Sequence, residues 1–452
     1  MQRTDLLRLT HQSMKNAALF APITKYSAEV QEPENISEVI ANAYQEAEAS
    51  KQGASFVSVP QDVTDAEVKT SVIAPLEPPK LGPASPIEST LLSQRIKAAK
   101  LPVLLLGMRA SDPETTRAIR RLIAETHLPV VETFQGAGII PRELEDDFFG
   151  RVGLFRNQPG DQLLKKSDLI IAIGYDPIEY EPRNWNSDRS ANIVVIDSMR
   201  AEIDKNYQPE RELVGDISQT LDFLLPYMKG YSMPNESKEY LDSLRKTLQK
   251  RDTPPAVTKD QVKSHPLSII QALQDRVTDD MTVTVDVGSF YIWMARHFRS
   301  YEPRHLLFSN GMQTLGVALP WAVAAALVRP NTKIVSVSGD GGFMFSSQDL
   351  ETAVRLGLNI VHIIWNDGNY DMVKFQEELK YGDSAAVKFG PVDFVKYAES
   401  FGAKGYRVEK AADLDKILDK AFKEDGPTVV DIPVDYSFNQ ELGKTILEDQ
   451  LH

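Results

Sequence analysis

The sequence predicts an α/β protein whose parallel sheets lie in three blocks along the chain. Short apolar runs rich in β-branched residues alternate with helical patterns, an order typical of parallel sheets with helices on both faces. The chain has 452 residues, too many for one ordinary core, and this length indicates two or three domains of roughly 100–200 residues each. We therefore expect three doubly wound parallel-sheet domains, of which the first is the shortest.

The first block covers residues 1–75. An amphipathic helical pattern at 36–50 leads into an apolar strand at 54–60, and the polar run 61–65 predicts a turn. Residues 76–88 follow as a linker, because the prolines of "LEPPKLGPASP" oppose both helix and sheet.

The second block, residues 89–227, predicts a Rossmann-like domain. Its predicted strands lie at 102–107, 128–134, 168–174 and 192–197. The sequence after the first strand is "LLLGMRAS" and contains no GxGxxG, so the residues give little direct support to dinucleotide binding. A charged segment at 228–262 predicts a second linker.

The third block, residues 263–452, carries the residues that predict chemistry. Its predicted strands lie at 281–288, 304–309, 333–339, 359–365 and 427–434. Ligands of open α/β sheets bind beyond the carboxyl ends of the strands. Asp340 follows one of these strands, and Asn366 and Asp367 follow the next. We therefore expect two carboxylates to face one crevice.

Composition excludes several classes of partner. The formal net charge is −14 and there is no cysteine, so a surface built for nucleic acid or anionic lipid, a disulfide framework and a thiolate metal site are not expected. The N-terminus lacks the apolar core of a secretion signal, and no stretch approaches the ~18 apolar residues of a membrane span. We expect a cytoplasmic protein that binds neither nucleic acid nor membrane.

The residues around Asp340 indicate a phosphate site. Oxygen ligands without histidine or cysteine favour a hard cation such as Mg²⁺, which often shares its shell with phosphate oxygens. Gly339, Gly341 and Gly342 would let the backbone approach that anion closely. The alternative is an exposed aspartate in a Gly-Asp-Gly turn, which "GDG" by itself favours.

The spacing of the two strand ends carries a resemblance. Twenty-four residues lie between Gly341 and Asn366, and this resembles the motif of the thiamine-diphosphate-dependent enzymes, in which GDG is followed at about that distance by an Asn-Asn-like pair. The resemblance implies three domains of this enzyme type. It also implies that Asp340 and Asp367 bind Mg²⁺ through their side chains and Asn369 through its backbone carbonyl.

Two further segments, "VDVGSFYIWMA" and "SNGMQTLGVALPWAVAAAL", are similar to other cofactor segments of these enzymes. The resemblance implies that a bulky residue, Leu315, lies beneath the bent cofactor, and that the carbonyl of Gln313 meets the aminopyrimidine. Plain core packing is the alternative for Leu315. Besides the metal ligands and the three glycines around Asp340, the resemblance implies these cofactor contacts: Gly288, Ser289, Phe290, Gln313, Leu315, Tyr370 and Met372.

Longer strings, among them "FAPITKYSAEV", "GRVGLFRNQPGDQLL" and "YAESFGAKG", resemble the catabolic acetolactate synthases. The resemblance implies decarboxylation of pyruvate and transfer of the two-carbon unit to a second pyruvate, giving 2-acetolactate. FAD is not expected, since Gly174 is followed by "YDPIEYEP" and not by the Arg-Phe-Asp-Asp-Arg stretch of the FAD-binding biosynthetic enzymes. Gln376 takes the place of a tryptophan that selects 2-ketobutyrate there, so we expect it to face the substrate; an exposed helix position is the alternative.

The first block departs from the family pattern. A glutamate of the first domain activates the cofactor in these enzymes, and the resemblance implies that this chain starts inside that domain, without the glutamate segment and with an incomplete sheet. None of the acidic residues Asp5, Glu29, Glu32, Glu34 and Glu38 lies in the equivalent of that segment, so none of them is predicted to activate the cofactor. Gln12 falls on a family position near the active site and is the other catalytic candidate, with a surface cap as the alternative.

Several functions therefore stay open. In the family the active site lies between subunits, which implies a homodimer or homotetramer if the interface survives the shortened first domain. The chain is predicted to be an acetolactate synthase whose activity depends on that missing segment. The alternatives are a non-catalytic remnant that binds cofactor or a partner subunit, and another pyruvate-using enzyme of the family, a pyruvate oxidase or pyruvate decarboxylase.

Overall fold

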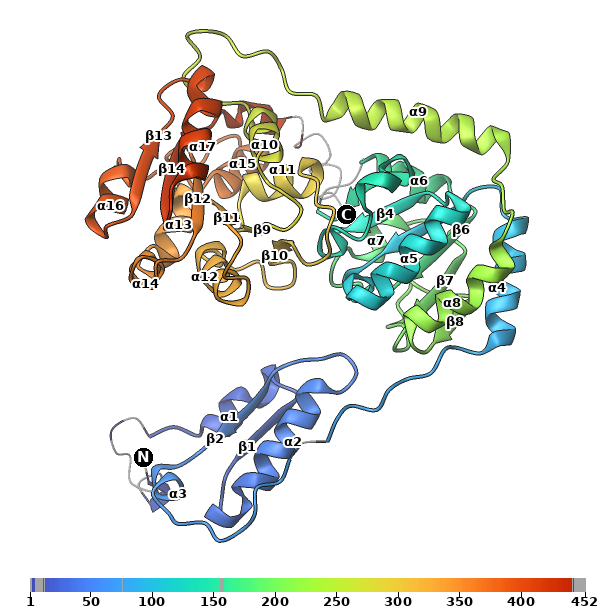
Figure 1. Cartoon of the computed structure of the whole chain (residues 1–452), viewed down its shortest axis with the longest axis horizontal. Coiled ribbons are helices and arrows are strands. Elements are labelled where there is room, and N and C mark those ends of the chain that lie inside the picture. The colour runs from blue at the N-terminus through green and yellow to red at the C-terminus, as the bar shows by residue number, and fades with distance from the viewer. Residues whose placement is uncertain are drawn as a thin grey trace. The chain divides into compact units, whose positions relative to one another are not determined.

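The computed structural model (Figure 1) describes residues 2–4, 11, 13–74, 76–154, 158–440 and 442. It divides into two compact units, Met1–Gly82 and Pro83–His452. The protein is α/β with parallel sheets of two, six and six strands, which confirms the predicted fold class. Among the residues described, no helix combines the length and the apolar character needed to cross a bilayer.

The first unit holds a small sheet of two strands. Strand β1 (Tyr26–Glu29) pairs in parallel with β2 (Ser55–Ser58), and α2 (Ile36–Glu48) connects them. Two short helices, α1 (Asn16–Phe20) and α3 (Gln61–Thr64), flank this pair. The first sheet is therefore small, as predicted.

Two details of the first unit differ from the prediction. The run expected as a turn at 61–65 forms one turn of helix, α3, which starts directly after Pro60. Strand β1 was not predicted, because its sequence "YSAE" has little apolar character and all four residues are only partly buried. Of the predicted linker 76–88, residues 76–85 form neither helix nor strand, whereas residues 86–88 already belong to a helix that begins at Pro86.

The central sheet has the strand order β5-β4-β3-β6-β7-β8, and its strand pairs are parallel. Its strands are β3 (Pro102–Leu106), β4 (Val130–Thr133), β5 (Phe148–Val152), β6 (Leu169–Ile173), β7 (Ile193–Asp197) and β8 (Arg211–Val214). Its helices are α4 (Pro86–Ala98), α5 (Pro113–Thr126), α6 (Pro159–Lys166), α7 (Pro182–Trp185) and α8 (Ile217–Met228). The order reverses between β3 and β6, as in a doubly wound sheet. The predicted strands are present, and β5 and β8 add one edge each.

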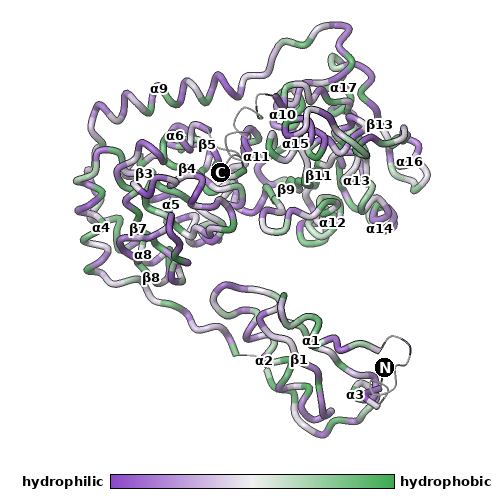
Figure 2. Tube along the Cα trace, turned by 180° about the vertical axis from the view of Figure 1, so that it is seen from behind, coloured by the Kyte–Doolittle hydropathy of each residue, from purple (hydrophilic) through white to green (hydrophobic). Residues whose placement is uncertain are grey.

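The segment predicted as the second linker contains a long helix, α9 (Asn235–Arg251), which corrects that prediction. Leu241, Leu244 and Leu248 are buried on it, and their spacing places them on one face of a helix. Figure 2 shows why the sequence hid this helix, since α9 is mostly hydrophilic in colour. A narrow apolar stripe is enough to attach it to the central domain.

The C-terminal sheet has the order β10-β9-β11-β12-β14-β13 and is also parallel. Its strands are β9 (Thr282–Val285), β10 (Leu306–Phe308), β11 (Ile334–Gly339), β12 (Ile360–Asn366), β13 (Lys404–Arg407) and β14 (Thr428–Pro433). Its helices are α10 (Pro266–Gln274), α11 (Ser289–His297), α12 (Ala318–Val328), α13 (Asp340–Ser346), α14 (Asp349–Arg355), α15 (Asp371–Tyr381), α16 (Phe394–Ser400) and α17 (Leu414–Lys423). Strand β13 was not predicted.

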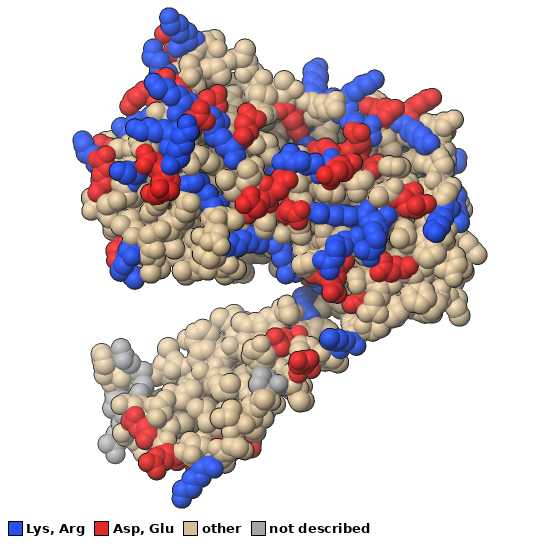
Figure 3. All heavy atoms as spheres, viewed as in Figure 1, with Lys and Arg blue, Asp and Glu red and all other residues tan. Residues whose placement is uncertain are grey.

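The central and C-terminal domains share contacts within the second unit. Phe134 and Ala137 of the central domain belong to the apolar core of the C-terminal domain, and the ring of Phe134 meets that of Tyr291 edge-on at 5.7 Å. On the face seen in Figure 3, acidic and basic side chains are interspersed over this unit.

Candidate functional site

The carboxyl ends of the C-terminal strands border a cavity of about 180 Å³. The lining contains all the residues predicted to hold the cofactor or the metal: Gly288, Ser289, Phe290, Gln313, Leu315, Gly339, Asp340, Gly341, Gly342, Asp367, Asn369, Tyr370 and Met372. These residues follow three different strands, β9, β11 and β12, or precede α12. The fold thus brings four separate segments to one place.

Asp340 joins two strand ends. Its Oδ1 accepts a hydrogen bond from the backbone N–H of Gly341 (2.9 Å), and its Oδ2 accepts one from Gly368 (2.7 Å), in the loop after β12. Burial, followed by the charge of Asp367, raises the pKa of Asp340 to about 7. Burial also raises the pKa of Asp367. A buried and a half-buried carboxylate whose charges repel form an arrangement that a divalent cation stabilises.

The loop after β12 is held by its own side chains and by a neighbouring segment. The side-chain amide of Asn369 donates to the backbone carbonyl (2.8 Å) and to Oδ2 (3.1 Å) of Asp367. The N–H of Tyr370 donates to the carbonyl of Val387 (2.8 Å). Gly368 has a φ of 75°, a conformation that favours glycine. Two of the predicted metal ligands, Asp367 and Asn369, therefore lie on a fixed loop.

Of the glycines beside Asp340, Gly341 leaves no room for a side chain and Gly342 leaves little. A Cβ on Gly341 would lie 2.7 Å from the ring of Tyr370 and 2.8 Å from that of Phe389. A Cβ on Gly342 would lie 3.2 Å from Oδ2 of Asp286. The rings of Tyr370 and Phe389 therefore explain why position 341 has no side chain, whereas the approach of this backbone to an anion stays a prediction.

The start of α11 forms another wall of the cavity. Gly288 has a φ of 157°, and the hydroxyl of Ser289 donates to the carboxylate of Asp371. Asp371 also accepts from the side-chain amide of Asn439 (2.7 Å), and burial raises its pKa to about 6. Asp371 therefore ties the start of α15 to the start of α11.

The loop before α12 is held by a buried carboxylate, Asp286. Both oxygens of Asp286 accept from the N–H of Gly316 (2.9 and 3.0 Å), and burial raises its pKa to about 6. Gln313 has a φ of 50°, which is uncommon outside glycine. Asp286 thus fixes the loop that carries Gln313 and Leu315 at the cavity.

Comparison with known proteins gives the family. Residues 286–432 match the thiamine pyrophosphate enzyme, C-terminal TPP binding domain, and residues 90–224 match the thiamine pyrophosphate enzyme, central domain. The chain is 50% identical to acetolactate synthase of Bacillus subtilis, over 97% of this chain and 77% of that protein. The chain belongs to the acetolactate synthase family.

Other members of the acetolactate synthase family match over similar lengths. The catabolic acetolactate synthase of Raoultella terrigena is 46% identical over 100% of this chain and 80% of its own length. Acetolactate synthase of Mycobacterium bovis is 29% identical over 91% of this chain and 69% of its own length. The family resemblance found in the sequence is therefore confirmed, and the C-terminal match implies thiamine diphosphate as the cofactor.

Of the two catalytic candidates of this acetolactate synthase family member, Gln376 is not among the described residues that line the cavity. Gln376 is exposed on α15, one helical turn beyond Met372, so the two residues share a helix face. Gln12 lies outside the described residues. Both roles stay predictions.

Two residues that line the cavity, Asp371 and Tyr436, and one that supports it from behind, Asp286, were not found by sequence reasoning. Asp286 and Asp371 act on segments far away in the chain, although Asp371 follows Asp367 at a helical spacing that was a usable signal. Tyr436 lines the same cavity, and its ring stacks on Trp365 with centroids 6.4 Å apart. No pattern in the sequence indicated Tyr436.

Proposed function

We propose that this chain converts two molecules of pyruvate to 2-acetolactate and CO₂, with thiamine diphosphate and Mg²⁺ as cofactors and without FAD. The observation that carries the proposal is the convergence of the predicted cofactor and metal residues, from four segments, on one cavity. The name and extent of the Bacillus subtilis relative support acetolactate synthesis as the reaction.

Asp340 and Asp367 are the proposed side-chain ligands of Mg²⁺, with the backbone carbonyl of Asn369 as a third. The raised pKa values of the two aspartates show that their ionised forms lack sufficient compensation in the protein alone. A cation between them would remove this cost. Phosphate oxygens and water commonly complete the shell of Mg²⁺ in such sites.

The remaining cavity residues bind and orient the cofactor. Gly288 and Ser289 begin a buried helix whose first N–H groups suit a diphosphate. Leu315 and the backbone carbonyl of Gln313, which both line the cavity, would contact the cofactor. The cofactor, when bound, supplies the electron sink for loss of CO₂ from a 2-keto acid. The apolar wall formed by Phe290 and its neighbours excludes water from the reacting atoms.

Gln376 is the proposed residue for the acceptor pyruvate. It follows Met372 by one helical turn, so both side chains lie on one face of α15. Met372 lines the cavity and Gln376 is exposed to solvent. A polar amide there suits a carboxylate of the acceptor.

Exposed apolar surface supports a homodimer or homotetramer. Helix α12 contains no charged residue, yet only four of its eleven residues are buried, and Leu327 and Val328 are 58% and 78% exposed. In the first unit Ile23 and Val72 are 71% and 88% exposed. Apolar surface of this extent is typical of protein interfaces.

The domain assignments follow from the same family. We assign residues 1–75 to the pyrimidine-binding domain, 89–227 to the central domain and 263–452 to the diphosphate-binding domain. The two matched ranges, 90–224 and 286–432, lie inside the last two of these.

The deciding experiment incubates the purified chain with pyruvate, thiamine diphosphate and Mg²⁺, without FAD, and analyses the products. Acetolactate supports the proposal. Acetaldehyde as the product would indicate a pyruvate decarboxylase, and acetyl phosphate would indicate a pyruvate oxidase. Tight cofactor binding without turnover would indicate a non-catalytic binding protein.

The substitution Asp340→Ala tests the proposed metal site. Removal of one buried carboxylate is expected to abolish Mg²⁺-dependent binding of thiamine diphosphate, measured by calorimetry, while the thermal midpoint of the cofactor-free protein is unchanged or raised. Unchanged cofactor affinity would contradict the metal role of Asp340.

A further inference from the structure

Helix α11 connects the cofactor cavity with the junction between the central and C-terminal domains. All nine of its residues are buried. Its first residue, Ser289, and the preceding Gly288 line the cavity. Its last residues, Arg296 and His297, lie against residues of the central domain and of the segment that ends α9, as the following contacts show.

A buried arginine of the central sheet caps the far end of α11. Arg151 comes from β5 and is 1% exposed. Its Nη1 donates to the carbonyl oxygens of Phe298 (2.6 Å) and Ala295 (3.2 Å). The last carbonyls of a helix have no partner within the helix, so Arg151 supplies one from another domain.

A second arginine reaches the same end from α9. Arg251 is the last residue of α9, and its Nη2 donates to the carbonyl of Arg296 (3.1 Å). Its Nη1 donates to Oε1 of Gln158 in the central domain (2.7 Å). Arg251 therefore bridges the central domain and α11 with one guanidinium.

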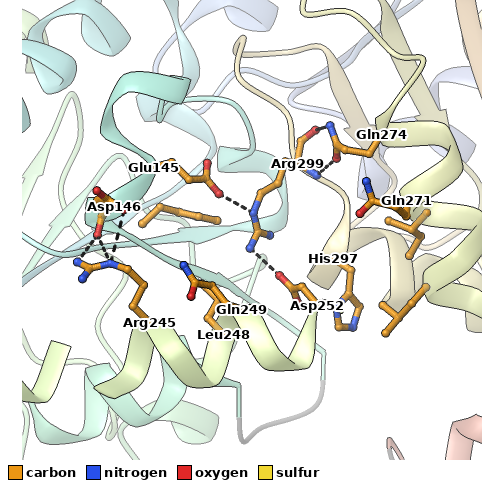
Figure 4. A pocket seen from close by; sticks show the side chains of 13 residues that line it. Glu145, Asp146, Arg245, Leu248, Gln249, Asp252, Gln271, Gln274, His297 and Arg299 are labelled. Atoms are coloured by element: carbon orange, nitrogen blue, oxygen red, sulfur yellow. Dashed lines mark hydrogen bonds and ion pairs between the residues drawn. The ribbon is translucent and has the colours of Figure 1, made fainter. Parts of the chain in front are cut away.

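An aspartate links these groups to a third arginine. Asp252 accepts from Nε of Arg251 (2.8 Å) and Nη2 of Arg299 (2.8 Å), and its Oδ1 lies 2.7 Å from Nδ1 of His297. Figure 4 shows Asp252 between Arg299 and His297 at the wall of a pocket of about 310 Å³. We call Arg151, Arg251, Asp252 and Arg299 the α11 clamp.

The chemistry of the α11 clamp suits a positioning role. The C-terminal end of a helix carries partial negative charge, and guanidinium groups there are favourable electrostatically and as donors. Two of the donors, Arg151 and Arg251, belong to the central domain and to α9. A shift of either element would therefore move a rigid, buried helix whose other end is Ser289.

We propose that the α11 clamp positions the cofactor-binding end of α11, so that the domain junction sets the affinity for thiamine diphosphate. This inference rests on the proposed function for the identity of the ligand. Arg251 and Asp252 are positioning residues, since they act on Gly288 and Ser289 only through the helix.

The test compares two arginines of α9. Arg251→Met removes a clamp donor. Arg245→Met is the control, because Arg245 lies on the same helix and also contacts the central domain, but donates to the carbonyl of Asp146 (3.0 and 2.6 Å) and not to α11. Calorimetry at saturating Mg²⁺ should give a Kd for thiamine diphosphate raised about tenfold by Arg251→Met. The control should stay within about twofold of the unaltered protein. Equal Kd values for the two variants would overturn the proposal.

A second measurement does not depend on the cofactor. Hydrogen exchange of the peptide that covers residues 288–293 should be faster in Arg251→Met than in Arg245→Met, both without ligand. If Arg251→Met does not fold, Asp252→Asn takes its place in both assays. If the unaltered protein does not bind thiamine diphosphate, the proposed function is wrong. If residues 288–293 exchange at the same rate in the two variants, the proposed role of the α11 clamp is wrong.

Discussion

Glu179 of the central domain makes the stability of this protein depend on pH. Its side chain is buried, with 4% of the residue exposed. Oε1 accepts from the hydroxyl of Thr133 (2.6 Å), and Oε2 accepts from the N–H of Met108 (2.8 Å). Burial is the main reason that the pKa of Glu179 rises from 4.5 to about 7.

The sign and size of the effect follow from these two values. Between pH 4.5 and about 7 the folded protein keeps a proton that the unfolded chain releases. The free energy of unfolding therefore falls as the pH rises through this window, and the loss is complete above pH 7. The difference between the two pKa values corresponds to about 3 kcal/mol.

Glu179→Gln should remove this pH dependence. The amide oxygen can accept from Met108 and the amide NH₂ can donate to Thr133, so both hydrogen bonds are retained. We expect urea unfolding to give a free energy of unfolding for each protein at pH 5 and at pH 8. From pH 5 to pH 8, the unaltered protein should lose about 2–3 kcal/mol more of this free energy than the variant does. Parallel pH profiles for the two proteins would refute the reasoning, because they would mean that Glu179 is ionised in the fold.

Two further substitutions test the packing around the site and the junction. Gly341→Ala should push against the rings of Tyr370 and Phe389, lower stability by about 1–3 kcal/mol and weaken cofactor binding; a thermal midpoint and cofactor Kd like those of the unaltered protein would contradict the close fit. Arg151→Met should destabilise by about 3–5 kcal/mol, because Glu132 is left buried without its partner. Adding Glu132→Gln should recover part of that loss in urea unfolding, and no recovery would mean that the pair itself is not the cause.

The strands that the sequence predicted are mostly those buried on both faces. Strands β3, β6 and β7 consist of continuous apolar runs, and all their residues are buried, as expected for the middle of a parallel sheet. The strands that were not predicted in the larger sheets, β5, β8 and β13, lie at sheet edges and contain charged residues. In β8 and β13 most of these residues are at least partly exposed, as is common on edge strands, whereas the charged residue of β5, Arg151, is buried.

In the candidate site, too, some residues could be predicted from the sequence and others could not. The positions of Asp340, Asp367 and the neighbouring glycines were predictable because both strand ends are marked in the sequence and the distance between them is specific. Asp286 could not be found in this way, since its function is to hold Gly316, 30 residues further along the chain. The place of Tyr436 depends on a contact with Trp365 that only the fold creates.

The irregular segment 76–85 has a practical consequence for the chain as a whole. Every described residue that lines the cofactor cavity belongs to the unit Pro83–His452, and residues 76–82 are exposed and contain no helix or strand that cleavage would interrupt. A protease that nicks this exposed stretch would leave the grip on the cofactor intact in one fragment. On the proposed function, a protein cleaved in this stretch could therefore lose activity and still bind thiamine diphosphate.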